Sequence, residues 1–407
     1  MKVLINKIIK WIKDNSYFLI ILSILLTVYF INFNSISKLN IYNFVFYTFS
    51  YNFGFISRGL IGSIFSLFLG YITIKKVYFI LNIVFIIFLI FIAYILNLFI
   101  KKSKEKETAF LTMLLCIFTP ASFMLMITGN EFGRLDIFIY ILSIIAFIII
   151  YKKRYLIFIP LIFIFAMFIH QNFLFMYAPL ILSILIYNWV KERNEKWLVL
   201  FLVSFLCLTF SFFLILKFGK PTNFKNAEEF AIVLREKTNI PISSSNFGAI
   251  DAEYFKSIKE HFKLTQARLK ITPKKNFVIG LFLLISYLYI QFILCYKEIL
   301  KKYKYSTFLL IFSCFGSLPL FFIGVDFGRW YIAIINSLVL LFVYLMFDNM
   351  KEREKSFKIN KSNQFLLIGI LIFYILIMQD TSFTFMDFSK INGVLNKLKK
   401  IILILIS

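Results

Sequence analysis

The chain has 407 residues, of which 61% are apolar and only 16% are charged, and its mean hydropathy is +0.86. Soluble domains carry about 45–50% apolar and about 25% charged residues. These polar side chains are too few to cover a water-soluble globule of 48.2 kDa. The composition therefore excludes an ordinary soluble protein and predicts a chain that crosses a membrane many times.

Basic residues outnumber acidic residues by 45 to 20, which gives a formal net charge of +25. In a soluble protein this balance would indicate nucleic-acid binding. Here most of the lysines and arginines form short clusters between apolar runs, where the headgroups of anionic lipids lie. We therefore expect membrane lipids as partners and no nucleic acid.

The N-terminal stretch has the pattern of a signal anchor. Four lysines lie within the first 13 residues, and an apolar run follows over 17–31 without a small-residue cleavage site behind it. This pattern predicts an uncleaved anchor whose N-terminus stays in the cytoplasm.

Apolar stretches of 15–24 residues follow one another along the chain. About 20 residues are needed to cross about 30 Å of hydrocarbon as a helix. Because the stretches lack the alternation of barrel strands, they indicate helices. We predict an all-α fold, a polytopic transmembrane helical bundle of 11–13 spans that forms one integral membrane domain over 1–407. The predicted spans are 17–33, 59–74, 77–100, 108–127, 136–151, 155–169, 173–189, 197–216, 276–296, 305–323, 330–347 and 364–380.

The loops between the spans differ in their content of lysine and arginine. One set of alternating loops contains 19 of these residues, and the short loops between them contain two. Because basic loops stay in the cytoplasm, the first set is predicted to face inward. The first set is 101–106, 152–154, 191–196, 297–304 and 351–361, and the second is 128–135, 170–172 and 324–329.

The topology of the first hundred residues has two solutions. An even number of spans must separate the N-terminus from the basic loop at 101–106, but three are predicted there. Either 59–74 is re-entrant, or the aromatic segment 41–56 also enters the membrane.

The segment 217–275 is the one sizeable polar interruption of the chain, and by parity it is extracytoplasmic. Apolar and charged residues have helical spacing over 227–237 and 252–270. We therefore expect short amphipathic helices that lie over the membrane face.

Three arginines lie in related phrases at predicted outer ends of spans. Residues 129–134 and 324–329 both read Gly-x-acid-Phe-Gly-Arg, and Arg58 follows a glycine-containing phrase that begins at Asn52. Glycine permits turns and a close approach to a ligand. Arginine presents a planar, permanently charged fork that suits phosphate or carboxylate oxygens. The pattern favours an anion site that includes Arg58, Arg134 and Arg329, and the alternative is that the arginines snorkel to headgroups.

Acidic residues and a histidine lie beside these arginines. Glu131 and Asp326 each precede an arginine by three residues and are candidate general bases. His170 is a candidate for acid–base chemistry or a structural residue. Asp136 opens a predicted span, as an N-cap-type acid or as a catalytic acid. The further candidate substrate contacts are Asn52, Gln171 and Trp330.

Several motifs are absent from the sequence. It contains no GxxxxGK[ST], GxGxxG or HExxH pattern, its four cysteines have no paired spacing, and it has two histidines. We therefore expect no cofactor and no metal site.

Length, composition, a dozen predicted spans, one moderate outer loop and outer-face arginines make the chain similar to the Wzy-type polysaccharide repeat-unit polymerases. The resemblance implies polymerisation of undecaprenyl-pyrophosphate-linked oligosaccharides on the outer face of the bacterial inner membrane. It also implies a chain-length regulator and a flippase as partners. The family's outer-loop pattern of arginine and glycine is not clear in 217–275, where Arg235 and Arg268 stand alone.

On this resemblance Arg58, Arg134 and Arg329 would hold the pyrophosphate of the lipid-linked sugar. The acceptor hydroxyl would lose its proton to Asp326, Glu131 or His170. No metal is required, because the pyrophosphate is already an activated leaving group.

Two other functions remain open. A GT-C-type glycosyltransferase that uses a polyprenyl-phosphate sugar would need an acid pair in its first outer loop, but 34–58 contains no Asp or Glu. A flippase for lipid-linked oligosaccharides would need no outer loop of this size, and its cations would line the middle of the spans.

Overall fold

The computed structural model describes residues 14–31, 39–127, 132–239, 247–296, 300, 303–352 and 361–377. Every regular element in this part of the chain is a helix. Its one strand-like feature is an isolated bridge between Ile72 and Thr238. The prediction of an all-α fold is therefore confirmed.

Four helices in the described part of the chain are long and apolar enough to cross a membrane, judged by length and composition. These helices cover Ile74–Lys102, Glu195–Phe218, Lys274–Leu294 and Phe327–Asp348. They belong to α5 (Ile74–Lys102), α12 (Glu195–Phe218), α16 (Lys274–Gln291) with the π-turn η6 (Phe292–Tyr296), and α20 (Phe327–Glu352). These helices support the prediction of a membrane protein.

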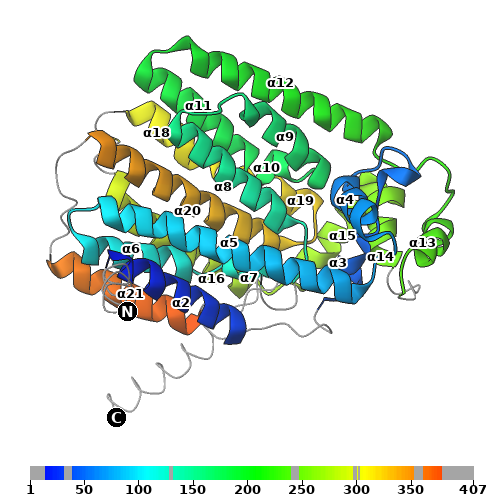
Figure 1. Cartoon of the computed structure of the whole chain (residues 1–407), viewed down its shortest axis with the longest axis horizontal. Coiled ribbons are helices and arrows are strands. Elements are labelled where there is room, and N and C mark those ends of the chain that lie inside the picture. Colours follow the sequence, from blue (N-terminus) through cyan, green and yellow to red (C-terminus); the bar gives the residue numbers. More distant parts are fainter. Residues whose placement is uncertain are drawn as a thin grey trace, which may run out of the picture.

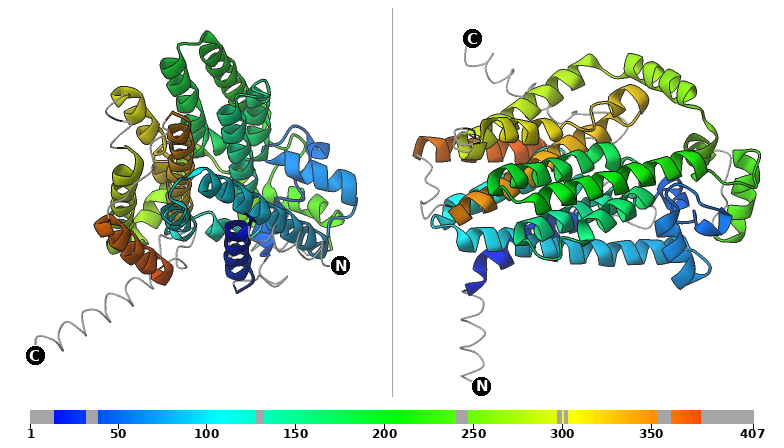
Figure 2. Two further views of the ribbon diagram at one scale, coloured as in Figure 1. Left: turned by 60° about the vertical axis from the view of Figure 1, so that its left-hand side comes forward. Right: turned by 90° about the horizontal axis from the view of Figure 1, so that it is seen from above.

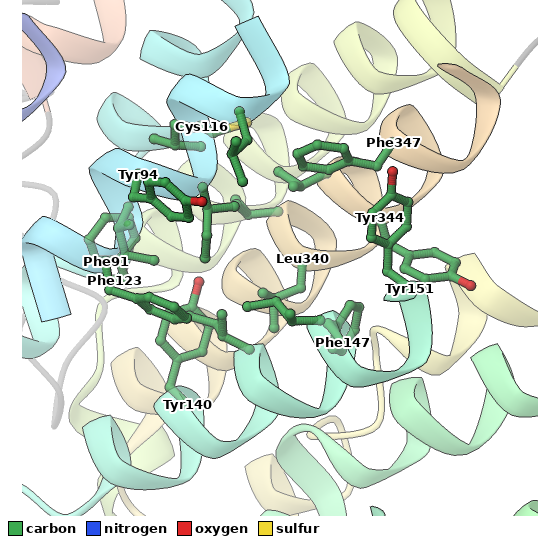
Figure 3. Close-up of a pocket in the computed structure, with 18 of the residues that line it drawn as sticks. Phe91, Tyr94, Cys116, Phe123, Tyr140, Phe147, Tyr151, Leu340, Tyr344 and Phe347 are labelled. Carbon is green, nitrogen blue, oxygen red and sulfur yellow. The ribbon is translucent and has the colours of Figure 1, made fainter. Parts of the chain in front are cut away.

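Helix α20 lies at the centre of the bundle (Figure 1). In its most apolar stretch 94% of the residues are buried, whereas in that of α12 only 22% are buried. The outer face of α12 carries large exposed apolar side chains, among them Leu206, Phe210 and Phe213. Soluble proteins avoid contiguous exposed apolar surface of this kind. A bilayer would cover it. An apolar cavity of about 190 Å³ lies beside α20 and is lined also by α5 and by α8 (Asp136–Lys152) (Figure 3).

Three predicted spans are each built from two helices. Pro120 follows the C-cap residue of one helix, Pro179 lies in the first turn of another, and Pro319 is the N-cap residue of a third. Proline lacks the amide hydrogen that continues a helix and restricts the residue before it. The three pairs are α6 (Lys106–Phe118) with α7 (Met124–Ile127), α10 (Phe173–Met176) with α11 (Ala178–Glu192), and α18 (Lys304–Ser313) with α19 (Leu320–Ile323).

The helices run back and forth between two ends of the molecule (Figures 1 and 2). Basic loops meet at one of them, which we call the lysine-rich end. There Lys102 Nζ donates to the Tyr151 hydroxyl at 3.1 Å, and Lys191 pairs with Asp348 at 2.6 Å. Three further apolar helices are shorter, namely α2 (Ser16–Ile31), α9 (Phe158–Ile169) and α21 (Lys361–Ile377).

The predicted span over 59–74 needs correction. Its helix α4 (Gly59–Leu69) has 11 residues and rises about 17 Å, which is too short to cross a bilayer. It lies at the end opposite the lysine-rich end (Figure 1). Lys101 Nζ donates to Asn15 Oδ1 at 2.9 Å, so α2 begins where α5 ends. Among the described residues, α2 and α5 are thus the two longest helices between these points, as in the solution in which 59–74 is re-entrant.

Residues 217–239 and 247–275, which we call the cap segment, cover the end opposite the lysine-rich end (Figures 1 and 2). Aromatic rings fasten the segment to the chain near α3 (Ile41–Val45) and η2 (Tyr51–Phe53). Phe230 lies 5.1 Å from Phe53 between ring centroids, and Tyr254 lies 5.2 Å from Phe49. Such pairs contribute about 0.5–1.5 kcal/mol each beyond the area they bury. The segment contains α13 (Ala227–Glu236), α14 (Phe247–Ile250), η5 (Asp251–Phe255) and α15 (Ile258–Ile271).

Gly62 allows α4 to touch the backbone beside α3. A β-carbon at Gly62 would lie 1.8 Å from the carbonyl oxygen of Phe49. We expect Gly62→Ala to destabilise the protein by about 1–3 kcal/mol, because the two segments must separate. The measurement is thermal unfolding of the purified protein in detergent.

Gly369→Ala is the matched control on α21, because a β-carbon added there would meet nothing within 4 Å. It should leave the melting temperature unchanged or raise it, since alanine favours a helix by about 0.5–1 kcal/mol. Equal melting temperatures for the two variants would contradict the packing described for α4.

Candidate functional site

Arg329 lies in the first turn of α20 and contacts three side chains from other elements or loops. Its Nε donates to Asp136 Oδ1 at 2.6 Å, and its Nη1 donates to Asp326 Oδ2 at 3.2 Å. Its Nη2 contacts Nε2 of His170, which follows α9 directly. Only 4% of the Arg329 side chain is exposed. The guanidinium therefore holds the ends of α8, α9 and α20 together.

The two similar phrases of the sequence meet in space. Arg134 Nη1 pairs with the same Asp326 Oδ2 at 3.4 Å, so the acid of the second phrase serves the arginine of both. The Arg134 guanidinium also lies 5.5 Å from the centroid of the Tyr42 ring. Gly133 precedes Arg134 with φ +89°, a conformation that glycine adopts without strain.

The third arginine pairs with an acid of the cap segment. Arg58 Nη2 lies 2.7 Å from Glu253 Oε2, and the other carboxylate oxygen accepts from Ser57 Oγ at 2.6 Å and from Gln171 Nε2 at 2.7 Å. Tyr254 donates its hydroxyl to the Ser57 carbonyl at 2.7 Å. Glu253 is therefore nearly buried, at 7% side-chain exposure, with donors on both oxygens.

Arg58 itself has a left-handed backbone with φ +58°. This conformation costs a residue other than glycine about 1–2 kcal/mol. Its Nε donates to Gln171 Oε1 at 3.4 Å, and its guanidinium carbon lies 4.9 Å from the centroid of the Phe46 ring. The surrounding contacts thus hold the guanidinium in place against a strained backbone.

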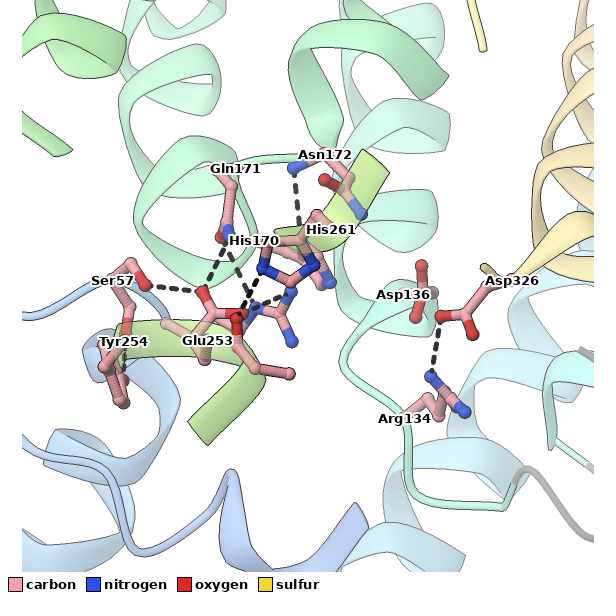
Figure 4. Close-up of polar contacts among 12 residues, drawn as sticks. Ser57, Arg134, Asp136, His170, Gln171, Asn172, Glu253, Tyr254, His261 and Asp326 are labelled. Carbon is pink, nitrogen blue, oxygen red and sulfur yellow. Dashed lines mark hydrogen bonds and ion pairs between the residues drawn. The ribbon is translucent and has the colours of Figure 1, made fainter. Parts of the chain in front are cut away.

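Together these residues form one group, which we call the arginine cluster (Figure 4). The neighbours His170 and Gln171 join its two halves, and the charges of all three arginines act on His170. Three guanidinium groups face three carboxylates, so the cluster is neutral as it stands. Its members are Arg58, Arg134, Asp136, His170, Gln171, Glu253, Asp326 and Arg329.

Burial and charge fix the protonation of two members. Burial lowers the pKa of His170, and the charges of Arg58, Arg329 and Arg134 lower it further, so the imidazole is neutral at pH 7. Burial by itself would raise the pKa of Asp326. Arg134 and Arg329 outweigh that effect, so this carboxyl has a pKa below its ordinary value and is ionised.

Asp136 is not a helix cap. The N-cap residue of α8 is Leu135, which makes no side-chain cap hydrogen bond, and Asp136 is the first residue of the helix. Asp136 therefore does not cap the helix by a hydrogen bond, but its carboxylate lies in the first turn, where a negative charge favours the start of a helix. Its Oδ1 accepts from Arg329, and its Oδ2 is buried without a hydrogen-bond partner among the described residues. A buried carboxylate oxygen without a donor is costly and is suited to accept a ligand proton.

The other predicted residues lie as follows. Trp330 is 3% exposed, and the centroid of its ring lies 5.0 Å from the Arg329 guanidinium carbon. The indole therefore packs against this guanidinium. Asn52 lies on η2 with an exposed side chain that makes no hydrogen bond to the described residues. Glu131 lies outside the described residues.

Glu253 was not predicted. It is one of five glutamates in 217–275, and the spacing of these glutamates does not distinguish it. Only the folding of the cap segment brings it to Arg58.

Because His170 is buried and neutral, we expect the free energy of unfolding to fall at acidic pH. As the pH falls below about 6.5, an unfolded histidine binds a proton that the folded His170 does not bind, so unfolding becomes more favourable. Each further pH unit costs about 1.4 kcal/mol until the folded pKa is reached. Thermal unfolding in detergent between pH 7 and pH 5 measures this effect.

In His170→Gln the group that titrates is gone, and we expect a shallower decline of the melting temperature with pH. His261→Gln is the control, because His261 lies outside the cluster and its Nε2 contacts the Ala252 carbonyl. Identical pH profiles for wild type and His170→Gln would contradict a neutral buried imidazole.

Within the described residues, no group of three His, Cys, Asp or Glu side chains is arranged to hold a metal ion. Comparison of the chain with protein-family models, with curated proteins and with solved structures finds no match. What the cluster can do is therefore argued from its own geometry and charge.

Proposed function

We propose that the protein is a membrane glycosyltransferase that polymerises undecaprenyl-pyrophosphate-linked oligosaccharide repeat units at the outer face of the bacterial inner membrane. One observation carries the proposal: three guanidinium groups from distant parts of the chain share one buried cluster with a neutral histidine and three carboxylates. In this proposal the lysine-rich end faces the cytoplasm, the bundle has 11–13 spans, and 217–275 is extracytoplasmic.

A diphosphate suits this cluster because arginine keeps its charge in a low-dielectric site and binds paired oxygens. In the absence of a ligand the carboxylates of Asp326 and Glu253 pair with the arginines, at the places where the phosphate oxygens would bind. The substrate would exchange its phosphate oxygens for these carboxylates. The exchange keeps the arginines paired, and it releases acids next to the bound substrate.

His170 lies directly against the same guanidinium. Its Nδ1 accepts the amide N–H of Asn172 at 3.2 Å, and its Nε2 contacts Nη2 of Arg329. A neutral imidazole at this place can hydrogen-bond a substrate that is bound to Arg329.

In the proposed reaction, an acceptor hydroxyl oxygen forms a bond to the anomeric carbon of the lipid-linked sugar. The bond from that carbon to the diphosphate oxygen breaks, and the lipid diphosphate leaves with the electron pair. The hydroxyl proton passes to the unpartnered Oδ2 of Asp136. The arginines stabilise the negative charge that grows on the leaving group. The lipid-linked oligosaccharide is thus both donor and acceptor.

A GT-C-type transferase that uses a polyprenyl-phosphate sugar is the second candidate. The convergence of Asp136, Asp326 and Glu253 supports it, because acids from other segments replace those missing from 34–58. A flippase draws less support, since the arginines lie at helix ends rather than in the middle of spans. The polymerase proposal keeps a flippase and a chain-length regulator as partners.

Deletion of the gene distinguishes these functions. In a strain without the protein, we expect surface glycan that carries a single repeat unit, because assembly and export continue while polymerisation stops. The measurement is the length ladder of the extracted glycan. Loss of all repeat units would indicate a flippase or an assembling transferase, and an unchanged ladder would contradict every one of these functions.

Replacing the arginines tests the diphosphate site. Arg134→Lys and Arg329→Lys should each shorten the glycan and lower polymer yield about 10- to 100-fold, because an ammonium cannot reproduce two parallel hydrogen bonds. The readout is the glycan ladder, normalised to protein in the membrane. Arg154→Lys is the matched control on an exposed turn beyond the lysine-rich end of α8. Full-length glycan in both cluster variants would exclude the diphosphate site.

Asp136→Asn tests the proposed base. The amide oxygen can still accept from Arg329 Nε, but the side chain no longer takes a proton. Polymer yield should fall at least about 100-fold while the protein still reaches the membrane. Asp251→Asn is the control, because Asp251 pairs with Lys256 on the cap segment, outside the arginine cluster. A normal polymer yield from Asp136→Asn would show that Asp136 is not the base.

A further inference from the structure

A second site candidate lies in the body of the bundle, away from the arginine cluster. The cavity of about 190 Å³ beside α20 is lined by α5, α6, α8 and α20 (Figure 3). Its walls are almost entirely aromatic and aliphatic side chains, including Phe91, Phe123, Phe147 and Leu340. A hydrocarbon chain is the kind of ligand that such walls accept.

The cavity reaches the outer surface of the bundle on the side of α5. Tyr94 lines it and is 52% exposed, and the nearby apolar side chains Ile87 and Ile90 are 60% and 42% exposed. In a bilayer this face of α5 would touch lipid chains. A lipid chain could therefore enter from the side without passing through water.

Two lysines lie where the cavity meets the lysine-rich end. Lys102 and Lys152 both line it and are exposed, and no Asp or Glu lines it. Lys102 Nζ is 3.1 Å from the Tyr151 hydroxyl and 5.7 Å from the centroid of the Phe347 ring. Neither lysine pairs with a carboxylate of the described residues.

Other lysines of the same end differ in this respect. Lys153 pairs with Glu192 at 2.7 Å, and Lys191 pairs with Asp348 at 2.6 Å. Neither of them lines the apolar cavity. Unneutralised positive charge therefore coincides with the mouth of the cavity.

We propose that this cavity binds an anionic phospholipid from the leaflet at the lysine-rich end. A section of one acyl chain occupies the apolar cavity, and the phosphate lies against Lys102 and Lys152. The charge complementarity selects an anionic headgroup, and the apolar walls select a chain. This lipid differs from the proposed sugar carrier, whose diphosphate would lie at the opposite end. The inference does not rest on the proposed function.

The lipid site is tested on the full-length protein purified in detergent. Phosphatidylglycerol and phosphatidylcholine with identical acyl chains are added, and bound lipid is counted by native mass spectrometry. We expect phosphatidylglycerol to bind at least 10-fold more tightly. Equal binding of the two lipids would overturn the proposed recognition of charge.

Two double variants separate a built site from general surface attraction. Lys102→Ala/Lys152→Ala should weaken phosphatidylglycerol binding about 10-fold and leave phosphatidylcholine binding unchanged. Lys101→Ala/Lys153→Ala removes the same charge at the same end from residues that do not line the cavity, and it should retain binding. An equal loss in both variants would overturn the proposal.

A third variant tests the place of the acyl chain. Leu98 lines the cavity and is half-buried, so Leu98→Trp fills the cavity while the core of the bundle stays intact. Binding of both lipids should fall while the lipid-free melting temperature stays that of wild type. Undiminished binding of phosphatidylglycerol by Leu98→Trp would place the lipid elsewhere and overturn the proposal.

Discussion

A buried positive charge must be neutralised, and this constraint governs the end of the bundle opposite the lysine-rich end. Arg329 is almost completely enclosed, and the removal of one partner from such a buried ion pair costs about 3–5 kcal/mol. Its partners Asp136 and Asp326 and its neighbour His170 come from three other positions in the chain. The first turn of α8, the end of α9 and the start of α20 are therefore held at one point.

Interrupted helices supply the backbone for this arrangement. The short helices α7, α10 and α19 each have four residues, and each lies in an apolar run that proline divides. Two of them lead into the phrases that contain Arg134 and Arg329. Because the chain turns within the bundle rather than beyond it, the charged side chains are directed inward.

Hydropathy alone predicts much of the fold. The predicted span 136–151 corresponds to α8, which runs from Asp136 to Lys152, since an uninterrupted apolar run of that length has few alternatives to a helix. The breaks were not predicted, because the sequence around Pro120 or Pro319 is as apolar as the helices beside it. The mean hydropathy of a long segment changes little when one of its residues is proline.

For the site, the repeated phrase around Arg134 and Arg329 was informative, because two similar turns on one side of a bundle have a common place to meet. Glu253 could not be found in this way. Its role depends on how the cap segment packs through Phe230 and Tyr254 onto Phe49, which is a tertiary contact without a local pattern.

The order in which the ribosome delivers these charges has a consequence for biogenesis. Arg58 and Glu253 are 195 residues apart, and Asp136 and Arg329 are 193 residues apart. During synthesis Arg58 and Asp136 are therefore made long before their counter-ions exist. Until then each charge must stay hydrated at the bilayer surface or near the translocon. A nascent chain that stops before position 329 keeps Asp136 without its partner Arg329, and such a fragment is a natural target for membrane proteases.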